Sequence, residues 1–480
     1  MRLSDPTLVQ TRCLINGQWQ SACAVLPVYN PASGELLATV PKLGSAEAQL
    51  AIAAATAAQA DWQARSGKER AQYLRRWFEL MMAAQDDLAR IMTAEQGKPL
   101  AEARGEIAYA ASFIEWFAEE AKRIYGDVMP HPQAGGHILT LKQAIGVCAA
   151  ITPWNFPAAM LTRKVGPALA AGCTIVVKPA SQTPLTALAL AELAQRAGIP
   201  AGVLNVITGP GAELGETLAN SPQVRKLSFT GSTATGRQLM ATSASNIKKL
   251  SLELGGNAPF IVFADADLDA AVAGAMASKF RNAGQTCVCA NRFLIAREIY
   301  EAFTARFAQA ISALKVGYGD ADSTHIGPLI DTPSVEKVES HIADALAQGA
   351  QLVCGGQRHP LGGSFFAPTL LRDVPPTALI NHEETFGPVA ALVRFSDEAE
   401  ALALANASEY GLAAYVYTRD LARTLRVATA LQTGMVGINT GLISNEVGPF
   451  GGIKQSGLGR EGSKYGIEEY LELKYLCLGH

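Results

Sequence analysis

The fold class follows from residues 224–241, which read VRKLSFTGSTATGRQLMA. Half of the first six residues are apolar, and these six predict a strand; Gly231 predicts a tight turn, and residues 233–241 have a helical pattern. The same order of strand, turn and helix recurs on both sides of this segment. Further strands are predicted at 144–151, 174–177, 203–208 and 259–263, and further helices at 184–197 and 268–281. This alternation predicts an α/β protein with a mostly parallel sheet that is covered on both faces.

The rest of the chain extends this plan. Its 480 residues exceed the roughly 250–300 that a single core supports, so two or more domains are expected. The first third predicts helices from Ser45 to Ala64, from Lys68 to Gln96 and from Leu100 to Arg123. A second α/β region is predicted from Tyr300 to about Val436.

Composition excludes several classes of function. The net charge of -3 gives no field for nucleic acid or an anionic membrane. No apolar run reaches the ~20 residues of a membrane span, and residues 1–10 do not resemble a secretory signal. The eight cysteines form no C-x-x-C pair and suggest neither a disulfide scaffold nor a metal site. A cytoplasmic enzyme without a metal is expected.

Two glycine-rich segments are candidates for phosphate contact. Residues 209–215 miss the dinucleotide-binding spacing by one position and favour a plain turn from strand to helix. Residues 229–236 are the better candidate, because Gly231 allows close backbone approach and the following helix start offers free amides. The alternative for Ser232 is an ordinary helix N-cap.

Three other segments carry side chains with possible catalytic chemistry. Cys287 follows a predicted helix end and a glycine turn, where exposure and nearby amides would lower its pKa, although a buried inert thiol is the alternative. Glu253 ends a short apolar strand and could have a raised pKa suited to a base, or could be a paired acid. Asn155 lies between two prolines that would hold its amide rigid for an oxyanion, or that merely stiffen a loop.

Taken together and in order, these segments resemble the aldehyde dehydrogenase superfamily over nearly the whole chain. The matching strings are 16–19, 30–31, 153–157, 178–184, 229–236, 253–259, 284–287, 383–388 and 449–457. The resemblance implies two α/β domains with a small β-hairpin oligomerisation domain. It would divide the chain into a dinucleotide-binding domain (1–125 and 142–253), a catalytic domain (254–455) and an oligomerisation element (126–141 and 456–480) of a homodimer or homotetramer.

The resemblance also implies a role for each matching residue. Cys287 would be the nucleophile, Glu253 would activate water, and the Asn155 side chain with the Cys287 N–H would form the oxyanion hole. Aldehyde oxidation would then proceed through a thiohemiacetal and a thioester. The cofactor would contact Trp154, Lys178, Ser181, Gly231, Ser232, Leu254, Glu384 and Phe386. Ala234 departs from the family pattern, since many relatives have Glu there.

Cofactor choice can be argued at position 181. Many relatives that prefer NAD carry Glu here, whereas this chain has Ser181 near Lys178. A hydroxyl and an ammonium suit a 2′-phosphate that a carboxylate would repel. NADP is therefore predicted, with NAD as the weaker alternative.

Segments 281–291, 437–445 and 457–466 bring the chain closest to bacterial succinate-semialdehyde dehydrogenases. That likeness places Arg163, Arg281 and Ser444 in the substrate pocket, where arginines would bind the far carboxylate of a small aldehyde. Glutarate semialdehyde, one methylene longer, is an open alternative.

Two further hypotheses remain. Related enzymes with Cys-x-Cys can form a reversible disulfide, which makes Cys289 a possible redox partner of Cys287. An alternative class, a thiol esterase, would use Cys287, Asn155 and Glu253 without a cofactor.

Overall fold

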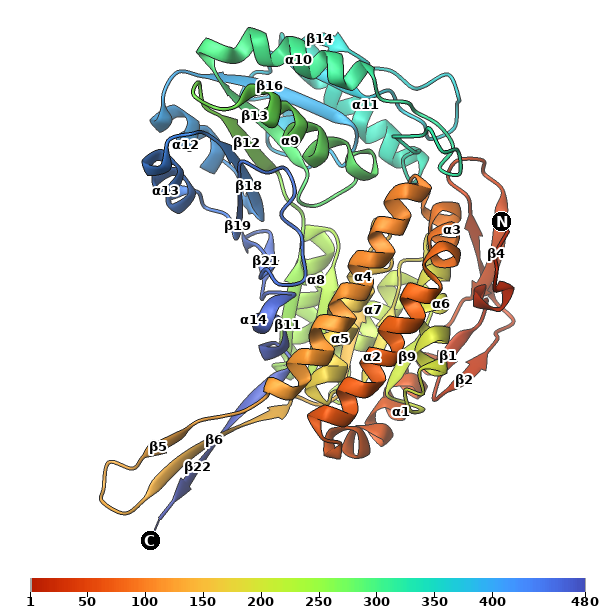
Figure 1. Ribbon diagram of the computed structural model, residues 1–480. Helices are drawn as coiled ribbons and strands as arrows, with labels where there is room; N and C mark the ends of the chain where they lie inside the picture. The colour runs from red at the N-terminus through yellow and green to blue at the C-terminus, as the bar shows by residue number, and fades with distance from the viewer. Residues whose placement is uncertain (1, 480) are drawn as a thin grey trace.

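The computed structural model describes residues 2–479 and contains two large sheets (Figure 1). The first sheet has eight strands in the order β2-β1-β9-β8-β7-β10-β11-β21. Strands β9 to β11 of this order are parallel, and β1, β2 and β21 add antiparallel edges. The bounds are β1 (Cys13–Ile15), β2 (Gln18–Gln20), β7 (Cys148–Ile151), β8 (Ile175–Lys178), β9 (Leu204–Val206), β10 (Lys226–Thr230), β11 (Lys249–Glu253) and β21 (Gly457–Leu458).

Helices cover both faces of this sheet, as the apolar strands require. One face packs on α2 to α6, and the other packs on α1, α7 and α8. The bounds are α1 (Ser45–Ala64), α2 (Gly67–Ala83), α3 (Gln85–Gln96), α4 (Leu100–Glu120), α5 (Ala159–Ala171), α6 (Pro184–Arg196), α7 (Gly211–Asn220) and α8 (Thr233–Ser243).

The second sheet has seven strands in the order β14-β15-β16-β13-β12-β18-β19, all parallel except β14. The strand bounds are β12 (Ala258–Val262), β13 (Ala290–Ala296), β14 (Gln351–Cys354), β15 (Thr369–Arg372), β16 (Val389–Phe395), β18 (Ala413–Tyr417) and β19 (Met435–Ile438). Its core includes residues of α9 (Leu268–Phe280), α10 (Tyr300–Ser312), α11 (Thr332–Ala347), α12 (Glu398–Asn406) and α13 (Leu421–Ala430). The predicted α/β class is confirmed.

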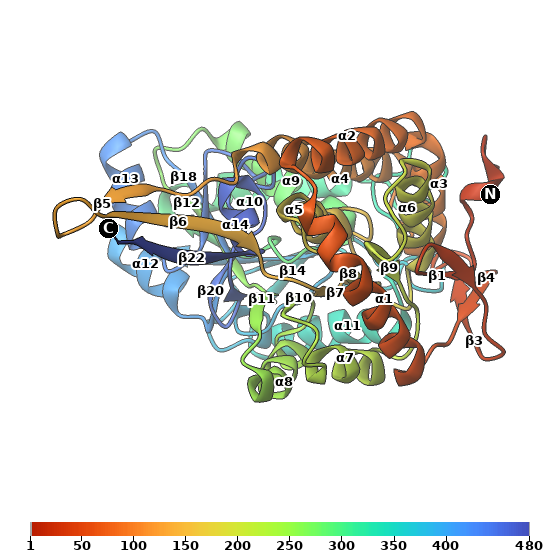
Figure 2. The same ribbon diagram turned by 90° about the horizontal axis from the view of Figure 1, so that it is seen from below.

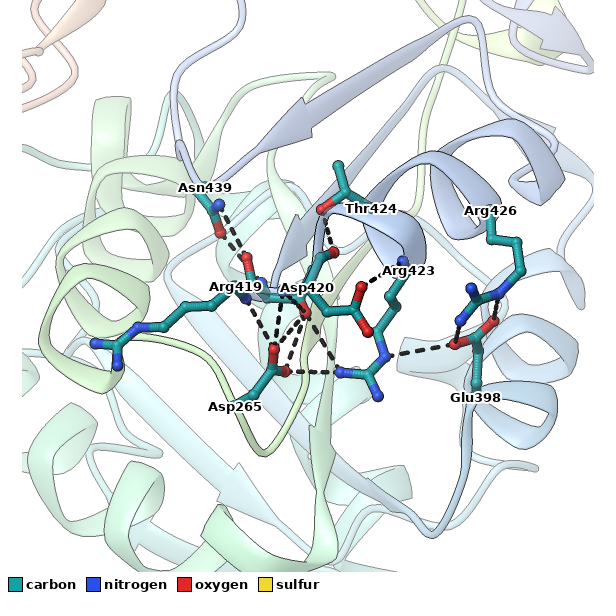
Figure 3. Close-up of polar contacts among 9 residues, drawn as sticks. Asp265, Glu398, Arg419, Asp420, Arg423, Thr424, Arg426 and Asn439 are labelled. Carbon is teal, nitrogen blue, oxygen red and sulfur yellow. Dashed lines mark hydrogen bonds and ion pairs between the residues drawn. The ribbon is translucent and has the colours of Figure 1, made fainter.

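An ionic network fixes the carboxyl ends of β12 and β18 (Figure 3). Asp265 accepts hydrogen bonds from the Thr418 hydroxyl at 2.8 Å and from the Arg423 guanidinium at 2.8 Å. The backbone N–H groups of Arg419 and Asp420 also donate to it. These bonds fix the turn that leads into α13. They do not involve the amino ends of the strands, which lie at the opposite edge of the sheet.

A three-stranded arm extends from the body of the molecule (Figures 1 and 2). It contains β5 (Val128–Pro130), β6 (His137–Ala144) and β22 (Leu471–Leu478), all antiparallel. Before β22, the chain forms α14 (Ser463–Glu468), which packs on α4 and α5. Two small two-stranded sheets, β3 (Val25–Tyr29) with β4 (Leu36–Pro41) and β17 (Tyr410–Gly411) with β20 (Ile453–Lys454), complete the strands.

Three predicted boundaries differ from the structure. The single helix expected over 68–96 is interrupted at Ala84, which ends α2 and begins α3. The N-cap of α1 is Gly44, whose N–H donates to Glu47, so Ser45 is the first helical residue rather than the cap. The strand expected over 144–151 is divided between β6 and β7, because Gly146 has a φ of 119° that interrupts the extended chain.

No helix within residues 2–479 combines the length and the apolar composition that crossing a bilayer requires.

Candidate active site

The candidate site lies where the two sheets meet. The carboxyl ends of β7, β8, β10 and β11 carry Asn155, Lys178, Gly231 and Glu253, either at the strand end or in the loop that follows. The amino ends of β13 and β16 closely follow Cys287 and Phe386. The Trp154 and Phe386 rings make an edge contact at 5.5 Å across this boundary. Ligand sites of open α/β sheets are usual at the carboxyl ends of strands, and here a second sheet completes the site.

Cys287 is half-buried in a loop with unusual backbone geometry. Asn282, Ala283 and Gly284 have φ values of 51°, 55° and 75°, so three successive residues are left-handed. Such a turn is costly and persists only where surrounding contacts hold it. Within residues 2–479 the backbone N–H of Cys287 has no hydrogen-bond acceptor, which leaves it available to an oxyanion.

The expected lowering of the Cys287 pKa is wrong for this structure. Burial raises the pKa of the thiol to about 12, and the carboxylate of Glu384 adds to the shift. Arg163 and Arg281 act in the opposite direction, which places both guanidinium groups within electrostatic reach of the sulfur. The prediction assumed an exposed turn, whereas Cys287 is half-buried and its neighbours in the turn are buried.

Asn155 is buried and tied to the cysteine loop. The side-chain Nδ2 of Asn155 donates to the backbone carbonyl of Gln285 at 3.0 Å. The backbone carbonyl of Asn155 accepts from Asn282 Nδ2 at 3.0 Å. Lys98 also donates to that carbonyl at 2.8 Å and forms a buried ion pair with Glu106. The side-chain amide of Asn155 is therefore held beside the loop of Cys287.

The predictions did not include Lys98, Glu106, Asn282 or Gln285. Glu106 also accepts from the N–H groups of Ala158 and Ala159 at 3.0 and 3.3 Å and so fixes the start of α5. Lys98 lies in the short break between α3 and α4, and Glu106 lies on α4. The sequence gives no signal that separates such a buried pair from a solvated one.

Glu253 ends β11 and is buried with no hydrogen-bond partner among residues 2–479 for either carboxylate oxygen. Burial raises its pKa well above the ordinary value, and the negative charge of Glu461 adds to the shift. Arg163 and Lys164 oppose it. The expected raised pKa of Glu253 agrees with this environment, which suits a carboxylate that takes a proton from water.

The two arginines that were predicted to bind substrate are both packed against aromatic rings. Arg163 on α5 is buried, lies 3.8 Å from the centre of the Phe450 ring and forms an ion pair with Glu461. Arg281 lies 4.9 Å from the centre of the Phe156 ring. Each guanidinium is thus held by a ring and stays within reach of the thiol.

A separate cleft of about 580 Å³ lies at the carboxyl ends of β7, β8 and β10. Its lining includes five of the residues predicted to contact a cofactor: Trp154, Lys178, Ser181, Gly231 and Ser232. Lys178 is buried without a carboxylate partner in the part of the chain described, and burial lowers its pKa to about 8. A buried unpaired ammonium favours an anionic ligand.

Other predicted cofactor contacts are placed differently. Ser232 is the N-cap of α8 and accepts from the N–H of Thr235 at 3.3 Å, so the capping alternative is realised as well. Leu254 packs against Gly236 of α8 and does not line the cleft. Glu384 does not line the cleft but lies near the Cys287 thiol, where it accepts from the N–H of Gly256 at 3.2 Å. Burial raises the pKa of Glu384 to about 7.

Cys289 is buried and makes no disulfide with Cys287. Its sulfur lies 3.5 Å from the carbonyl of Lys279. Ser444 is half-buried in the loop after β19, near Tyr109 of α4.

Residues 19–476 match the model of the aldehyde dehydrogenase family. The chain is 64% identical, over the full length of both proteins, to the NADP-dependent succinate-semialdehyde dehydrogenase GabD of Escherichia coli strain K12. It is 63% identical over the same extent to a glutarate-semialdehyde dehydrogenase of Pseudomonas aeruginosa. A crystal structure described as an NADP-dependent enzyme of E. coli covers both chains completely with a TM-score of 0.99 and 64% identity.

Proposed function

The chain belongs to the aldehyde dehydrogenase family and has its fold, and from this membership we propose that it oxidises succinate semialdehyde to succinate with NADP. The observation that carries the substrate assignment is the pair of guanidinium groups, Arg163 and Arg281, within electrostatic reach of Cys287. A substrate that is attacked at one end by the thiolate would present its other end to these cations. A terminal carboxylate is the group that arginines bind best in such a place.

NADP fits the donors of the cleft. Lys178 would supply a buried cation, Ser181 a hydroxyl, and Gly231 with the start of α8 backbone amides for a pyrophosphate. When bound, NADP would supply the acceptor for the hydride that the substrate loses. Trp154 and Phe386 would enclose the nicotinamide end, and Glu384 would bind its ribose.

The chain's own residues account for the remaining chemistry. The Cys287 thiolate attacks the aldehyde carbon, and the resulting oxyanion is stabilised by the Cys287 N–H and the Asn155 amide. After oxidation a thioester joins Cys287 to the acyl group. Glu253 takes a proton from water, which attacks the thioester and releases the acid together with the thiol. A thiol esterase is not favoured, because the family and the relatives above are dehydrogenases.

Glutarate semialdehyde is the second candidate substrate, because the relative from P. aeruginosa is named for it and is almost as similar. Succinate semialdehyde and glutarate semialdehyde differ by one methylene, and an apolar pocket discriminates such a difference by only about 1–3 kcal/mol.

We also propose that the chain divides at the boundaries expected from its sequence and that the arm joins copies of it into a homo-oligomer. Val128, Leu473 and Tyr475 of the arm are 69%, 65% and 60% exposed, so a partner strand or sheet would bury them.

Initial rates of cofactor reduction test the function. We expect the highest kcat/KM with NADP and succinate semialdehyde, a lower value with glutarate semialdehyde and a much lower value with butanal, which lacks the carboxylate. A higher kcat/KM with butanal would refute the carboxylate pocket, and a higher value with glutarate semialdehyde would make the second candidate the substrate.

A further inference from the structure

Tyr109 of α4 has a buried hydroxyl that the protein satisfies only in part. Its Oη makes no hydrogen bond of ordinary geometry among residues 2–479, although the Ser444 side chain is close enough to interact with it and its ring packs edge-on against Phe113 at 4.9 Å. A buried hydroxyl without a partner destabilises a folded protein, and phenylalanine would fill the same space without that cost. The hydroxyl therefore keeps the capacity to donate to a ligand from outside the chain.

The groups around this hydroxyl are those that would bind a carboxylate. Arg163, Arg281 and Ser444 all act on the Tyr109 phenol, whose pKa is raised first by burial and then lowered in part by these neighbours. The phenol keeps its proton at neutral pH and is a hydrogen-bond donor there. Arg163 has an unsatisfied donor of its own, because Nη2 is buried without a partner in the described chain.

The Phe113 ring lies 4.9 Å from the Tyr109 ring and 5.4 Å from the Arg163 guanidinium. Two incompletely satisfied donors that share one neighbour favour an acceptor with several lone pairs. A carboxylate offers about four acceptor positions and no donor. An aldehyde oxygen offers fewer acceptor positions than a carboxylate. In the proposed mechanism it already accepts from the Asn155 amide and the Cys287 N–H. The Tyr109 hydroxyl belongs to the end of the pocket where both arginines lie.

We propose that the Tyr109 hydroxyl donates a hydrogen bond to the distal carboxylate of the substrate, beside Arg163, Arg281 and Ser444. This inference rests on the proposed function and adds a fourth donor to its pocket. The hydroxyl is matched to an anion, so an uncharged aldehyde of the same length gains nothing from it.

The test replaces Tyr109 by Phe, which keeps the ring and removes only the oxygen. We expect the ratio of kcat/KM for succinate semialdehyde to kcat/KM for butanal to fall about 10-fold to 100-fold, as the loss of a hydrogen bond to a charged group implies. Tyr73→Phe is the matched control, because Tyr73 also has an aromatic neighbour and a bond to an arginine, Arg65, but lies on α2 outside the site. Its ratio should stay that of the wild type.

A binding measurement complements the rates. Succinate should inhibit butanal oxidation by the wild type, and its Ki should rise at least 10-fold in Tyr109→Phe and stay unchanged in Tyr73→Phe. A wild type that prefers succinate semialdehyde, with an unaltered ratio and Ki in Tyr109→Phe, would overturn the role of Tyr109 alone. A wild type with no preference for succinate semialdehyde and no inhibition by succinate would overturn the carboxylate pocket and this inference together.

Discussion

Arg163 Nε lies 3.0 Å from Glu461 Oε2, and both side chains are buried. The neighbouring Lys164 forms a second ion pair with the same carboxylate and donates to Thr230 Oγ1 at 2.7 Å. Two cations thus share one internal anion, which leaves one positive charge for a substrate carboxylate. Glu461 holds Arg163 in place without neutralising the pocket.

Replacing Glu461 by Gln should therefore destabilise the protein. Removing one member of a buried ion pair typically costs about 3–5 kcal/mol, because the remaining charges stay buried and unpaired. The free energy of unfolding in urea measures the effect. Glu468→Gln is the control, since the pair of Glu468 with Lys142 is partly exposed and should contribute less than about 1 kcal/mol. Equal losses in the two variants would contradict the argument.

Glu253→Gln should slow the hydrolysis of the thioester. A general base contributes roughly 10²–10⁴-fold, so steady-state turnover should fall by that factor while a first burst of reduced cofactor remains. Because the pKa of Glu253 is raised, its basic form is lost as pH falls, and the wild-type rate should rise with pH well above 4.5. Stopped-flow absorbance between pH 5 and 9 would show both effects. Wild-type turnover in the Gln variant would exclude Glu253 as the base.

The thiol of Cys287 should react slowly with iodoacetamide when no cofactor is present. Its pKa of about 12 keeps the thiolate fraction small, so alkylation should accelerate about 10-fold for each pH unit from 7 to 10. Glu384→Gln removes a negative charge that raises this pKa and should speed alkylation at pH 8. Peptide mass spectrometry follows Cys287, with the exposed Cys23 as an internal reference. A slower reaction in Glu384→Gln would contradict the electrostatic cause.

Cys289 offers a test of the redox hypothesis. The motivating observation is its position two residues after Cys287, although the two sulfurs form no disulfide and Cys289 is buried. If the pair protects the nucleophile, wild-type activity lost to peroxide should return with dithiothreitol, whereas Cys289→Ala should be inactivated irreversibly through overoxidation. Cys354→Ala, which removes another free thiol in the same domain, serves as the control. Equal recovery in all three proteins would refute the switch.

The alternation of strands and helices could be predicted because parallel strands are buried on both faces and are therefore rich in apolar residues, as in β7 and β8. Glu253 could be placed at a strand end for the same reason. The break at Ala84 could not be predicted, since no glycine or proline marks it and the apolar pattern continues through it.

The chemical environment of the site was harder to predict than its residues. Cys287 has a raised pKa because the fold buries its thiol and brings the Glu384 carboxylate near it, and no local pattern reveals either effect. The pairing of Arg163 with Glu461 joins residues nearly three hundred positions apart. Tyr109 lies on an ordinary helix, and only the packing of α4 against α5 gives its hydroxyl a place in the site.

Ser181→Glu should reverse the choice of cofactor. Ser181 lines the cleft beside Lys178, so a glutamate here would add a carboxylate to the lining of the proposed cofactor site. The new charge would repel a 2′-phosphate and accept hydrogen bonds from ribose hydroxyls. We expect kcat/KM for NADP to fall at least 10-fold and that for NAD to rise, as measured at saturating succinate semialdehyde. Ser181→Gln, which has a similar shape without the charge, should show a much smaller change; an equal change in both variants would attribute the preference to size rather than to charge.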